Sequence, residues 1–367
     1  MGAIPEPTVT VRMKENGFET GAYGLWPVDT PVASRPCTLR KLVTERNDMN
    51  QISSTTSRPT SGALLMLTAS LAFAGTNVLQ SYLAWPIGMP STGMTFWQYL
   101  VATIIALPLI ARIGVGNLRT SHPVVHEIRA FVSALGVHVF VYAFASGMPV
   151  WQVVALLATG PLFIVLGSTL FLGERASPVR LFAALLGFAG ALMVSGIGTD
   201  GFTILVLVPI AAAALWATTD VLTKYLTKRD ESPETLTVSL LVLITPNHLL
   251  ILLVATLLSQ VPGLLPAGVA TGFPFQLPEG IGVWLLVLLG VLTAAAQYLL
   301  AFAYKLADAT YLQPFGDLKV PLTAVIGFIF LSQTPTIWFW IGSALIIGAS
   351  LLIYLAEAPR GERLAAA

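Results

Sequence analysis

The sequence predicts an all-α polytopic membrane protein with ten transmembrane helices, arranged as two inverted five-helix repeats. Of its 367 residues, 55% are hydrophobic and only 10% are charged, and the mean hydropathy is +0.80. Soluble domains carry about 25% charged residues, so this composition indicates a chain that crosses a bilayer repeatedly. Two further observations support this fold class: a series of apolar runs of membrane length, and a pattern that recurs in both halves.

The two ends of the chain differ from the rest. Residues 1–60 are rich in proline, carry scattered charges and have no continuous apolar core, so we expect a disordered cytoplasmic tail. We also expect translation to begin at Met49 rather than at Met1, because the first apolar run follows soon after it. Residues 358–367 are expected to form a second cytoplasmic tail.

Between the tails, apolar runs alternate with short polar breaks. A helix needs about 20 apolar residues to cross a bilayer. The first repeat, residues 61–196, and the second, residues 197–357, each hold five such runs. We expect spanning helices at 63–83, 95–112, 127–146, 150–172, 178–196, 202–225, 235–259, 281–304, 308–331 and 336–355.

The basic residues predict the orientation. If the N-terminus is cytoplasmic, every Lys and Arg except Lys319 falls in a tail or in a connection on the cytoplasmic side. The positive-inside rule then predicts that both termini are cytoplasmic in a plasma membrane, here a bacterial inner membrane. With five helices in each half, the two halves have opposite orientations.

Short stretches recur in the two halves in the same order. Five residues near the start of the first half have identical counterparts in the second: Thr76, Val78, Leu79, Tyr82 and Leu83 recur as Thr219, Val221, Leu222, Tyr225 and Leu226. Asn77 falls on Asp220, Pro161 falls on Pro321, and FLGERAS at Phe171 falls on FLSQTPT at Phe330. Such a duplication with inverted topology is typical of secondary transporters.

One stretch carries a family resemblance. It extends from Trp151 through Pro161 to the residues Leu172-Gly173-Glu174-Arg175-Ala176-Ser177, and is followed by a helix with Gly187 and Gly190. It resembles the EamA family of the drug/metabolite transporter superfamily, and the resemblance covers about residues 62–356. The resemblance implies ten helices, a central cavity and alternating access. Gln333 departs from it, because the second repeat often has Glu there, and Asp317 and Lys319 are polar where many members are apolar.

The strongest site candidates are Asp317 and Lys319, in the otherwise apolar run QPFGDLKVP. A Lys or Asp at the middle of a membrane costs roughly 2.5 to 3.5 kcal/mol, so both are expected to face protein, water or a solute. They are two residues apart, and hence about 200° apart around the helix, so they cannot pair face to face, whereas Gln313, Asp317 and Pro321 share one face.

Other polar residues in the apolar runs have both a structural and a functional interpretation. Asp220 lies on one helix face with Lys224, so an ion pair and a proton or solute role both remain open. For Asn77, both an interhelical hydrogen bond and a ligand contact remain open. For His138, both an interhelical hydrogen bond and a proton relay remain open. The remaining candidates are Gln297, Tyr298 and Trp216 as cavity residues, and Pro161 and Pro321 as hinges or kinks.

These residues predict transport by alternating access of a small polar metabolite that carries an anionic or zwitterionic group. Lys319 would attract that group, and Asp317 or Asp220 would take up and release a proton. The expected partners are the solute and the lipid bilayer, with no nucleic acid, and a homodimer is left open. No cofactor or metal is expected, and the single cysteine, Cys37, excludes an internal disulfide.

Two alternatives compete with a transporter. Two membrane aspartates, Asp220 and Asp317, invite comparison with an intramembrane aspartyl protease. The Tyr-Asp and Gly-x-Gly-Asp motifs of that class are absent, and no other hydrolase or nucleotide-binding motif is present, so we do not expect an enzyme. A channel is the other alternative, although no ring of like charges is evident.

Overall fold

The computed structural model describes residues 59–114, 119–174, 177–196, 203–265, 269, 279–307 and 309–357. Within these ranges the chain is helical and has no strand. The expected tails before residue 59 and after residue 357, with Met49, lie outside the described residues.

The helices follow the predicted segments closely. They are α2 (Pro59–Ala84), α3 (Ser91–Ile113), α4 (Pro123–Ala145), α5 (Val150–Leu157), α6 (Gly160–Leu172), α7 (Pro178–Ser195), η2 (Ile204–Val206), α8 (Leu207–Thr227), α9 (Pro233–Leu258), α10 (Ile281–Leu306), α11 (Ala309–Asp317), α12 (Lys319–Leu331) and α13 (Ile337–Glu357). By length and composition, nine segments of the described chain can cross a membrane, with α5–α6, η2–α8 and α11–α12 each counted as one; α3 is not among the nine.

Several helix ends follow local sequence rules. Ser177 caps α7 by accepting a hydrogen bond from the backbone N of Arg180 at 3.2 Å, and Ser232 caps α9 in the same way from Thr235 at 3.1 Å. Both caps are followed by proline, whose missing N–H costs nothing at a helix start. α6 ends at Gly173, where a left-handed backbone with φ 64° favours glycine.

Two of the predicted spans are broken, which differs from the continuous helices expected at 150–172 and 308–331. α5 ends at Leu157 and α6 starts at Gly160, while α11 ends at Asp317 and α12 starts at Lys319. Each break has the same cause. Proline has no N–H and collides with the carbonyl group four residues earlier. Leu157 lies four residues before Pro161, and Asp317 lies four residues before Pro321, so each proline ends the helix at the corresponding residue.

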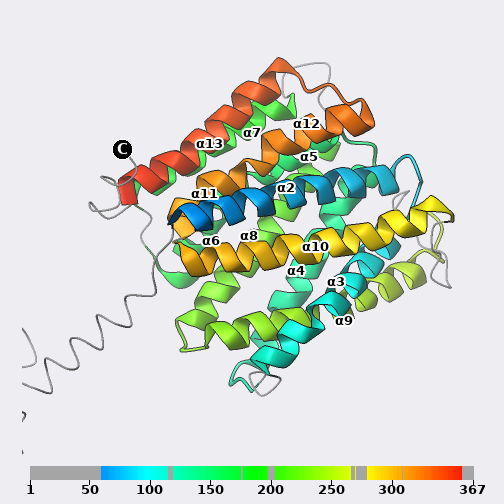
Figure 1. Ribbon diagram of the computed structural model, residues 1–367, viewed down its shortest axis with the longest axis horizontal. Coiled ribbons are helices and arrows are strands. Elements are labelled where there is room, and N and C mark those ends of the chain that lie inside the picture. The colour runs from blue at the N-terminus through cyan, green and yellow to red at the C-terminus, as the bar shows by residue number, and fades with distance from the viewer. Residues whose placement is uncertain are drawn as a thin grey trace, which may run out of the picture. The chain divides into compact units, whose positions relative to one another are not determined.

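The helices pack in a regular set of pairs. α2 lies against α10, α4 against α8, and α7 against α13, while α3 contacts both α9 and α10 (Figure 1). The α7–α13 contact depends on Gly190 and Gly342. A Cβ atom on Gly190 would lie only 2.6 Å from the backbone oxygen of Gly342, so small residues allow these backbones to touch.

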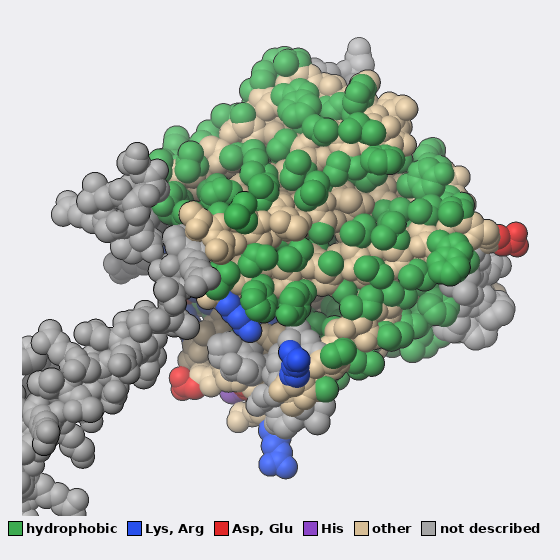
Figure 2. Space-filling view, in the orientation of Figure 1, with side chains coloured by type: hydrophobic (Ala, Val, Ile, Leu, Met, Phe, Trp, Pro, Cys, Tyr) green, Lys and Arg blue, Asp and Glu red, His purple; other side chains and the backbone are tan. Residues whose placement is uncertain are grey.

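The interior and the surface of the bundle are both apolar. Phe144 and Leu156, from α4 and α5, are fully buried in the main core with Leu83 and Phe339. Hydrophobic side chains also cover the outer face over α13, α12, α2 and α10 (Figure 2). An apolar surface of this extent is unusual for a soluble protein, and it suits helices that face lipid.

Candidate functional site

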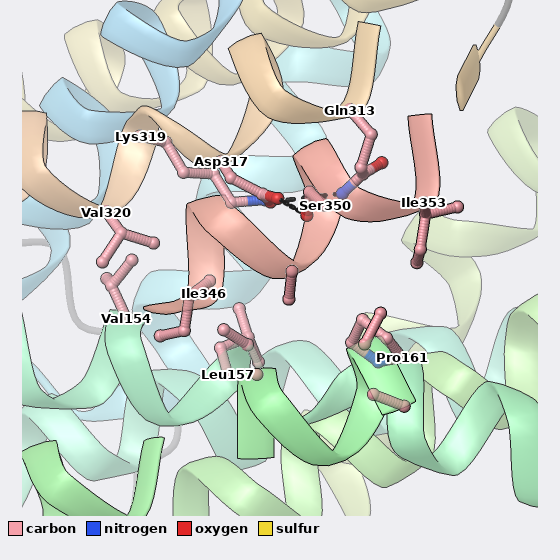
Figure 3. A pocket seen from close by; sticks show the side chains of 15 residues that line it. Val154, Leu157, Pro161, Gln313, Asp317, Lys319, Val320, Ile346, Ser350 and Ile353 are labelled. Atoms are coloured by element: carbon pink, nitrogen blue, oxygen red, sulfur yellow. Dashed lines mark hydrogen bonds between the residues drawn. The ribbon is translucent and has the colours of Figure 1, made fainter. Parts of the chain in front are cut away.

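A cavity of about 130 Å³ lies between the broken helices and their neighbours (Figure 3). One wall comes from α5, α6 and α7, and the other from α11, α12 and α13. The apolar wall includes Val154, Leu157, Pro161, Ala183, Ala184, Gly187 and Ile346, and the polar side chains are Gln313, Asp317, Lys319 and Ser350.

The helix breaks explain where this cavity lies. Leu157 and Asp317, the last residues of α5 and α11, both line it. A break in a membrane helix leaves backbone groups without their usual partners, and such groups are tolerated in protein or beside a polar cavity. The two proline-dependent breaks therefore face each other across the cavity.

Asp317 is anchored by two neighbours. Its side chain is buried, and its Oδ1 accepts a hydrogen bond from Gln313 Nε2 at 3.1 Å. Ser350 Oγ on α13 donates a second hydrogen bond to Oδ2. The sequence placed Gln313 and Asp317 on one helix face but did not predict this hydrogen bond. Ser350 was missed, because a serine in an apolar run gives no signal in the sequence beyond that of a small packing residue.

Lys319 is the first residue of α12, and its half-buried side chain lines the same cavity. The expectation that it points away from Asp317 was based on a continuous helix. The interruption at Leu318 changes that geometry, and both side chains reach one space (Figure 3). Within the described ranges no ion pair within 4.0 Å involves Lys319, although its charge interacts with that of Asp317 across the cavity.

Asp220 lies on α8 with an exposed side chain. The ion pair with Lys224, one of the two interpretations left open by the sequence, is not seen among the described residues, and Lys224 Nζ binds Glu174. Asp220 and Asp317 both interact electrostatically with Tyr304 on α10. This tyrosine is exposed by 45% and lies within electrostatic range of two carboxylates that are far apart in the sequence.

Two other candidates contact neighbouring helices and do not line the cavity. Asn77 is buried and donates a hydrogen bond to Thr323 Oγ1 at 3.3 Å, which joins α2 to α12. Trp216 donates from Nε1 to the backbone oxygen of Ser133 at 3.2 Å and lies against Gly136 on α4. Helix contact, the structural interpretation of Asn77, is therefore observed, and Trp216 fills an interhelical gap.

The remaining candidates are also separate from the cavity. His138 is buried, and its Nε2 lies 3.1 Å from Nδ1 of His248 on α9. His248 was missed by the sequence analysis. Gln297 and Tyr298 are exposed on α10, and Tyr298 packs beside Phe302 with ring centroids 5.4 Å apart.

One end of the bundle, which we call the charged end, is defined by Glu174, Lys224, Lys228 and Glu231. Glu174 follows α6 and binds two lysines of α8 and its C-cap: Lys224, and Lys228 at 2.7 Å. The hydrogen bonds from Lys224 and Lys228 lower the pKa of Glu174 below its ordinary value of 4.5. Arg175, the next residue in the chain, lies outside the described residues.

This contact predicts a stability difference that depends on pH. A carboxylate with a lowered pKa stabilises the fold fully above its ordinary pKa, and this stabilisation is lost as the pH falls through the folded-state value. Exposed ion pairs contribute about 0.2 to 1 kcal/mol, so Glu174→Gln should lower the thermal stability slightly at neutral pH. Unfolding curves of the two proteins in detergent should converge as the pH falls well below 4.5. A difference that stays constant with pH would contradict this assignment.

A buried arginine also lies near the charged end. Arg129 on α4 is 2% exposed and donates hydrogen bonds to Thr223 Oγ1 at 3.2 Å and to Ser239 Oγ at 3.0 Å. It also donates to the backbone oxygen of Leu236. One guanidinium group therefore ties α4 to both α8 and α9.

Glu231 lies beside this arginine network, in the connection between α8 and α9. Burial raises the pKa of Glu231, but hydrogen bonds from Thr120 and His122 and the nearby His126 outweigh this effect and lower it below the ordinary value. The charged end is therefore a polar network that connects several helices.

The opposite end, defined by Trp85, Gly147 and Gln333, has two further cavities. One of about 590 Å³ is lined by residues that include Trp151, Gln152 and Trp338. The other, of about 350 Å³, is lined by residues that include Tyr82, Trp85 and Gln333. Gln333 Oε1 accepts a hydrogen bond from the backbone N of Val150 at 2.7 Å, which holds the start of α5.

Comparison with known proteins gives two matches to one family. Residues 60–196 and 203–355 each match the EamA-like transporter family. A riboflavin transporter of Rhizobium johnstonii is 41% identical over 86% of this chain and 99% of that protein. A riboflavin transporter of Vibrio cholerae is 37% identical over 83% of this chain and 96% of that protein. An S-adenosylmethionine uptake transporter of Rickettsia felis is 25% identical over 80% of this chain and 91% of that protein. A solved crystal structure with 20% identity covers 82% of this chain and 99% of its own, with a TM-score of 0.53.

Proposed function

Because this chain belongs to the EamA-like transporter family, we propose that it is a secondary transporter that carries riboflavin by alternating access. It is an integral membrane protein and a transporter of small metabolites rather than an enzyme, as the family and the similar proteins indicate. The choice of solute rests on the relatives named riboflavin transporter, which are 37% to 42% identical to this chain. The aspartyl protease alternative has no support from the family match.

The proposal includes ten membrane spans in two inverted repeats, with α3 as the tenth. The two family matches support a duplication. The packing supports it too. In the repeat, α8, α9 and α10 are the counterparts of α2, α3 and α4. The α2–α10 contact then corresponds to the α8–α4 contact, and the α3–α10 contact corresponds to the α9–α4 contact; all four contacts are present. Glu174 and its counterpart Gln333 lie at opposite ends of the bundle, as inversion requires.

We further propose that the charged end faces the cytoplasm, with both termini on that side. Lys224 and Lys228 lie at this end, and Lys and Arg are enriched on the cytoplasmic side of membrane proteins. Transport then requires the bundle to open alternately at the charged end and at the opposite end.

The cavity between the broken helices suits an amphipathic solute such as riboflavin. Its apolar wall, with Val154, Leu157 and Ile346, can contact a flat ring system, and the polar wall offers both donors and acceptors. Riboflavin carries no net charge at neutral pH. In this proposal Lys319 therefore donates a hydrogen bond to a ring carbonyl instead of pairing with a carboxylate, and Asp317 accepts one from a hydroxyl or imide N–H.

The size of the cavity supports a conformational change during transport. Its volume of about 130 Å³ is below the roughly 300 Å³ at which pockets for drug-sized ligands begin. A solute of that size therefore enters only if the walls separate. The breaks at Pro161 and Pro321 are the points where helices can bend with least loss of hydrogen bonding, and we assign them a hinge role.

Uptake by the purified protein tests this proposal. In proteoliposomes, labelled riboflavin should accumulate in a saturable way and should be displaced by unlabelled riboflavin. Labelled S-adenosylmethionine, the solute of more distant relatives, should not accumulate and should not compete. Protein-free liposomes give the background. Uptake of S-adenosylmethionine without uptake of riboflavin would reject the solute, and uptake of neither would reject both.

A further inference from the structure

Two histidines from different helices meet in the interior of the bundle. His138 belongs to α4 in the first family match, and His248 belongs to α9 in the second. The side chains are 5% and 0% exposed, and the ring nitrogens Nε2 of His138 and Nδ1 of His248 lie 3.1 Å apart. The pair thus forms a hydrogen bond between the two halves of the molecule.

The outward nitrogens of this pair have no partner. Neither His138 Nδ1 nor His248 Nε2 forms a hydrogen bond within the described structure. Two neutral rings that share one hydrogen bond leave one N–H group and one lone pair unused. A buried polar group without a partner costs about 1 to 3 kcal/mol, so the neutral pair is complete only when something else binds to it.

The surroundings add few other groups that can change charge. Tyr99 on α3 stacks against His248, with ring centroids 4.2 Å apart, and Glu127 on α4 accepts a hydrogen bond from Asn247 at 3.0 Å. From α8, α2 and α5, no charged side chain of the described chain interacts with either ring. Histidine is the side chain whose ordinary pKa lies near neutral pH, so the two histidines are the groups at this junction that can take up a proton once water reaches them.

The counterpart junction has different chemistry. Under the repeat exchange, the α4–α9 contact corresponds to the α10–α3 contact. There Gln98 Nε2 donates to Thr293 Oγ1 at 2.9 Å and Gln80 Nε2 donates to Gln98 Oε1 at 2.9 Å. Amides and hydroxyls of this kind hold helices together but do not titrate. One of two equivalent junctions is titratable, and helix contact alone does not require that difference.

We propose that His138 and His248 form the binding site of the proton that is coupled to solute transport, at a place separate from the solute cavity. This inference rests on the proposed transport function. Neither histidine lines the cavity that holds Asp317 and Lys319, so the proton and the solute act on each other through the movement of the helices.

The physical reason for coupling is that the pair bridges two halves that must move. Burial of an unpaired charge is costly, so a proton from water binds to a ring nitrogen when α4 and α9 separate and water enters. The positive charge then opposes closure of the α4–α9 contact, which re-forms only after the proton has returned to water. Pro246 lies inside α9, two residues before His248, and removes a backbone hydrogen bond where this movement occurs.

The test separates movement of the solute from coupling to protons. Proteoliposomes are assayed with labelled riboflavin in two ways: exchange against internal unlabelled riboflavin at equal pH, and accumulation driven by an imposed pH gradient. Glutamine can form the same interhelical hydrogen bond but does not bind a proton. We therefore expect His138→Gln and His248→Gln to keep exchange within about twofold and to lose at least about fivefold of gradient-driven accumulation, the lower range of coupling between sites.

A matched variant controls for loss of an interhelical hydrogen bond. Thr293→Val breaks the counterpart junction and should leave the pH response unchanged. If a single histidine variant does not fold, the double variant with glutamine at both positions carries the test, because two amides can bond each other as the two rings do. Gradient-driven accumulation at the wild-type level in the histidine variants would overturn the proposal.

Failure of the transport function itself gives a different result. Wild-type protein that moves riboflavin without any effect of a pH gradient overturns the proton site and leaves the proposed function intact. If the wild-type protein moves no riboflavin, the proposed function fails. The pair is then judged by thermal unfolding in detergent across a pH series, where an identical pH dependence of the wild type and the double variant would reject it.

Discussion

Lys319→Ala and Asp317→Asn are each expected to reduce riboflavin uptake strongly while the protein remains folded. A hydrogen bond to a charged group contributes about 1.5 to 3 kcal/mol, which corresponds to about 10-fold to 150-fold in affinity. Lys319 forms no ion pair within 4.0 Å among the described residues and interacts with Asp317 only at longer range, so its removal should affect solute binding more than stability. Saturable uptake in proteoliposomes measures the loss of solute binding, and thermal unfolding of the same preparations measures any loss of stability.

Two variants control this experiment. Lys305→Ala removes an exposed lysine at the end of α10, away from the cavity, and should leave uptake unchanged. Ser350→Ala removes one of the two donors that hold Asp317 and should give a smaller loss than Asp317→Asn. Wild-type uptake in both Lys319→Ala and Asp317→Asn would remove the pair from the mechanism and make them structural residues.

Arg129→Ala is expected to destabilise the fold severely. The change removes the buried donor to Thr223 Oγ1 and to Ser239 Oγ, and one of the two side-chain donors to the backbone oxygen of Leu236. Each buried group left unpaired costs about 1 to 3 kcal/mol, so we expect a loss of about 3 to 5 kcal/mol in the free energy of unfolding, the range of severe single mutations. Unfolding of the detergent-solubilised protein, by heat or denaturant, measures this loss.

The matched control for Arg129 is Arg112, an exposed arginine in the last turn of α3. Arg112→Ala should change the free energy of unfolding by less than about 0.5 kcal/mol, as surface substitutions do. Equal effects of the two alanine substitutions would mean that the hydrogen bonds of Arg129 contribute little. Arg129→Lys should recover only part of the stability, because an ammonium group cannot form the planar set of hydrogen bonds.

The membrane class and the helix segments could be predicted from the sequence because they depend on local composition. An apolar run of about 20 residues forms a helix in a bilayer because no water is present there, and only a helix lets its backbone N–H and C=O groups bond each other within one segment. The effect of Pro161 and Pro321 was only partly predicted. Both prolines are visible in the sequence, and the structure shows a kink at each of them, with Thr159 and Leu318 in right-handed helical conformation between the two helix segments; whether the kink is also a hinge has no signal in the sequence.

The partners across helices could not be predicted from a single sequence. His248 and Ser350 are ordinary residues within their own segments, and each gains its importance from a residue more than 30 positions away in the chain. Lys224 shows the same limit, because its spacing from Asp220 indicated a pair on one helix face, whereas Glu174 binds it from another part of the chain. Local spacing predicts which contacts are possible, and packing selects among them.

The contact between Gly190 and Gly342 limits how this scaffold can change its solute. These residues hold α7 and α13 at backbone distance, so neither helix can accept a larger side chain at that point without moving the other. The distance between the two cavity walls is therefore fixed where α7 meets α13. Attempts to redesign specificity should begin with the residues of α5, α6, α11 and α12 that flank the two helix breaks.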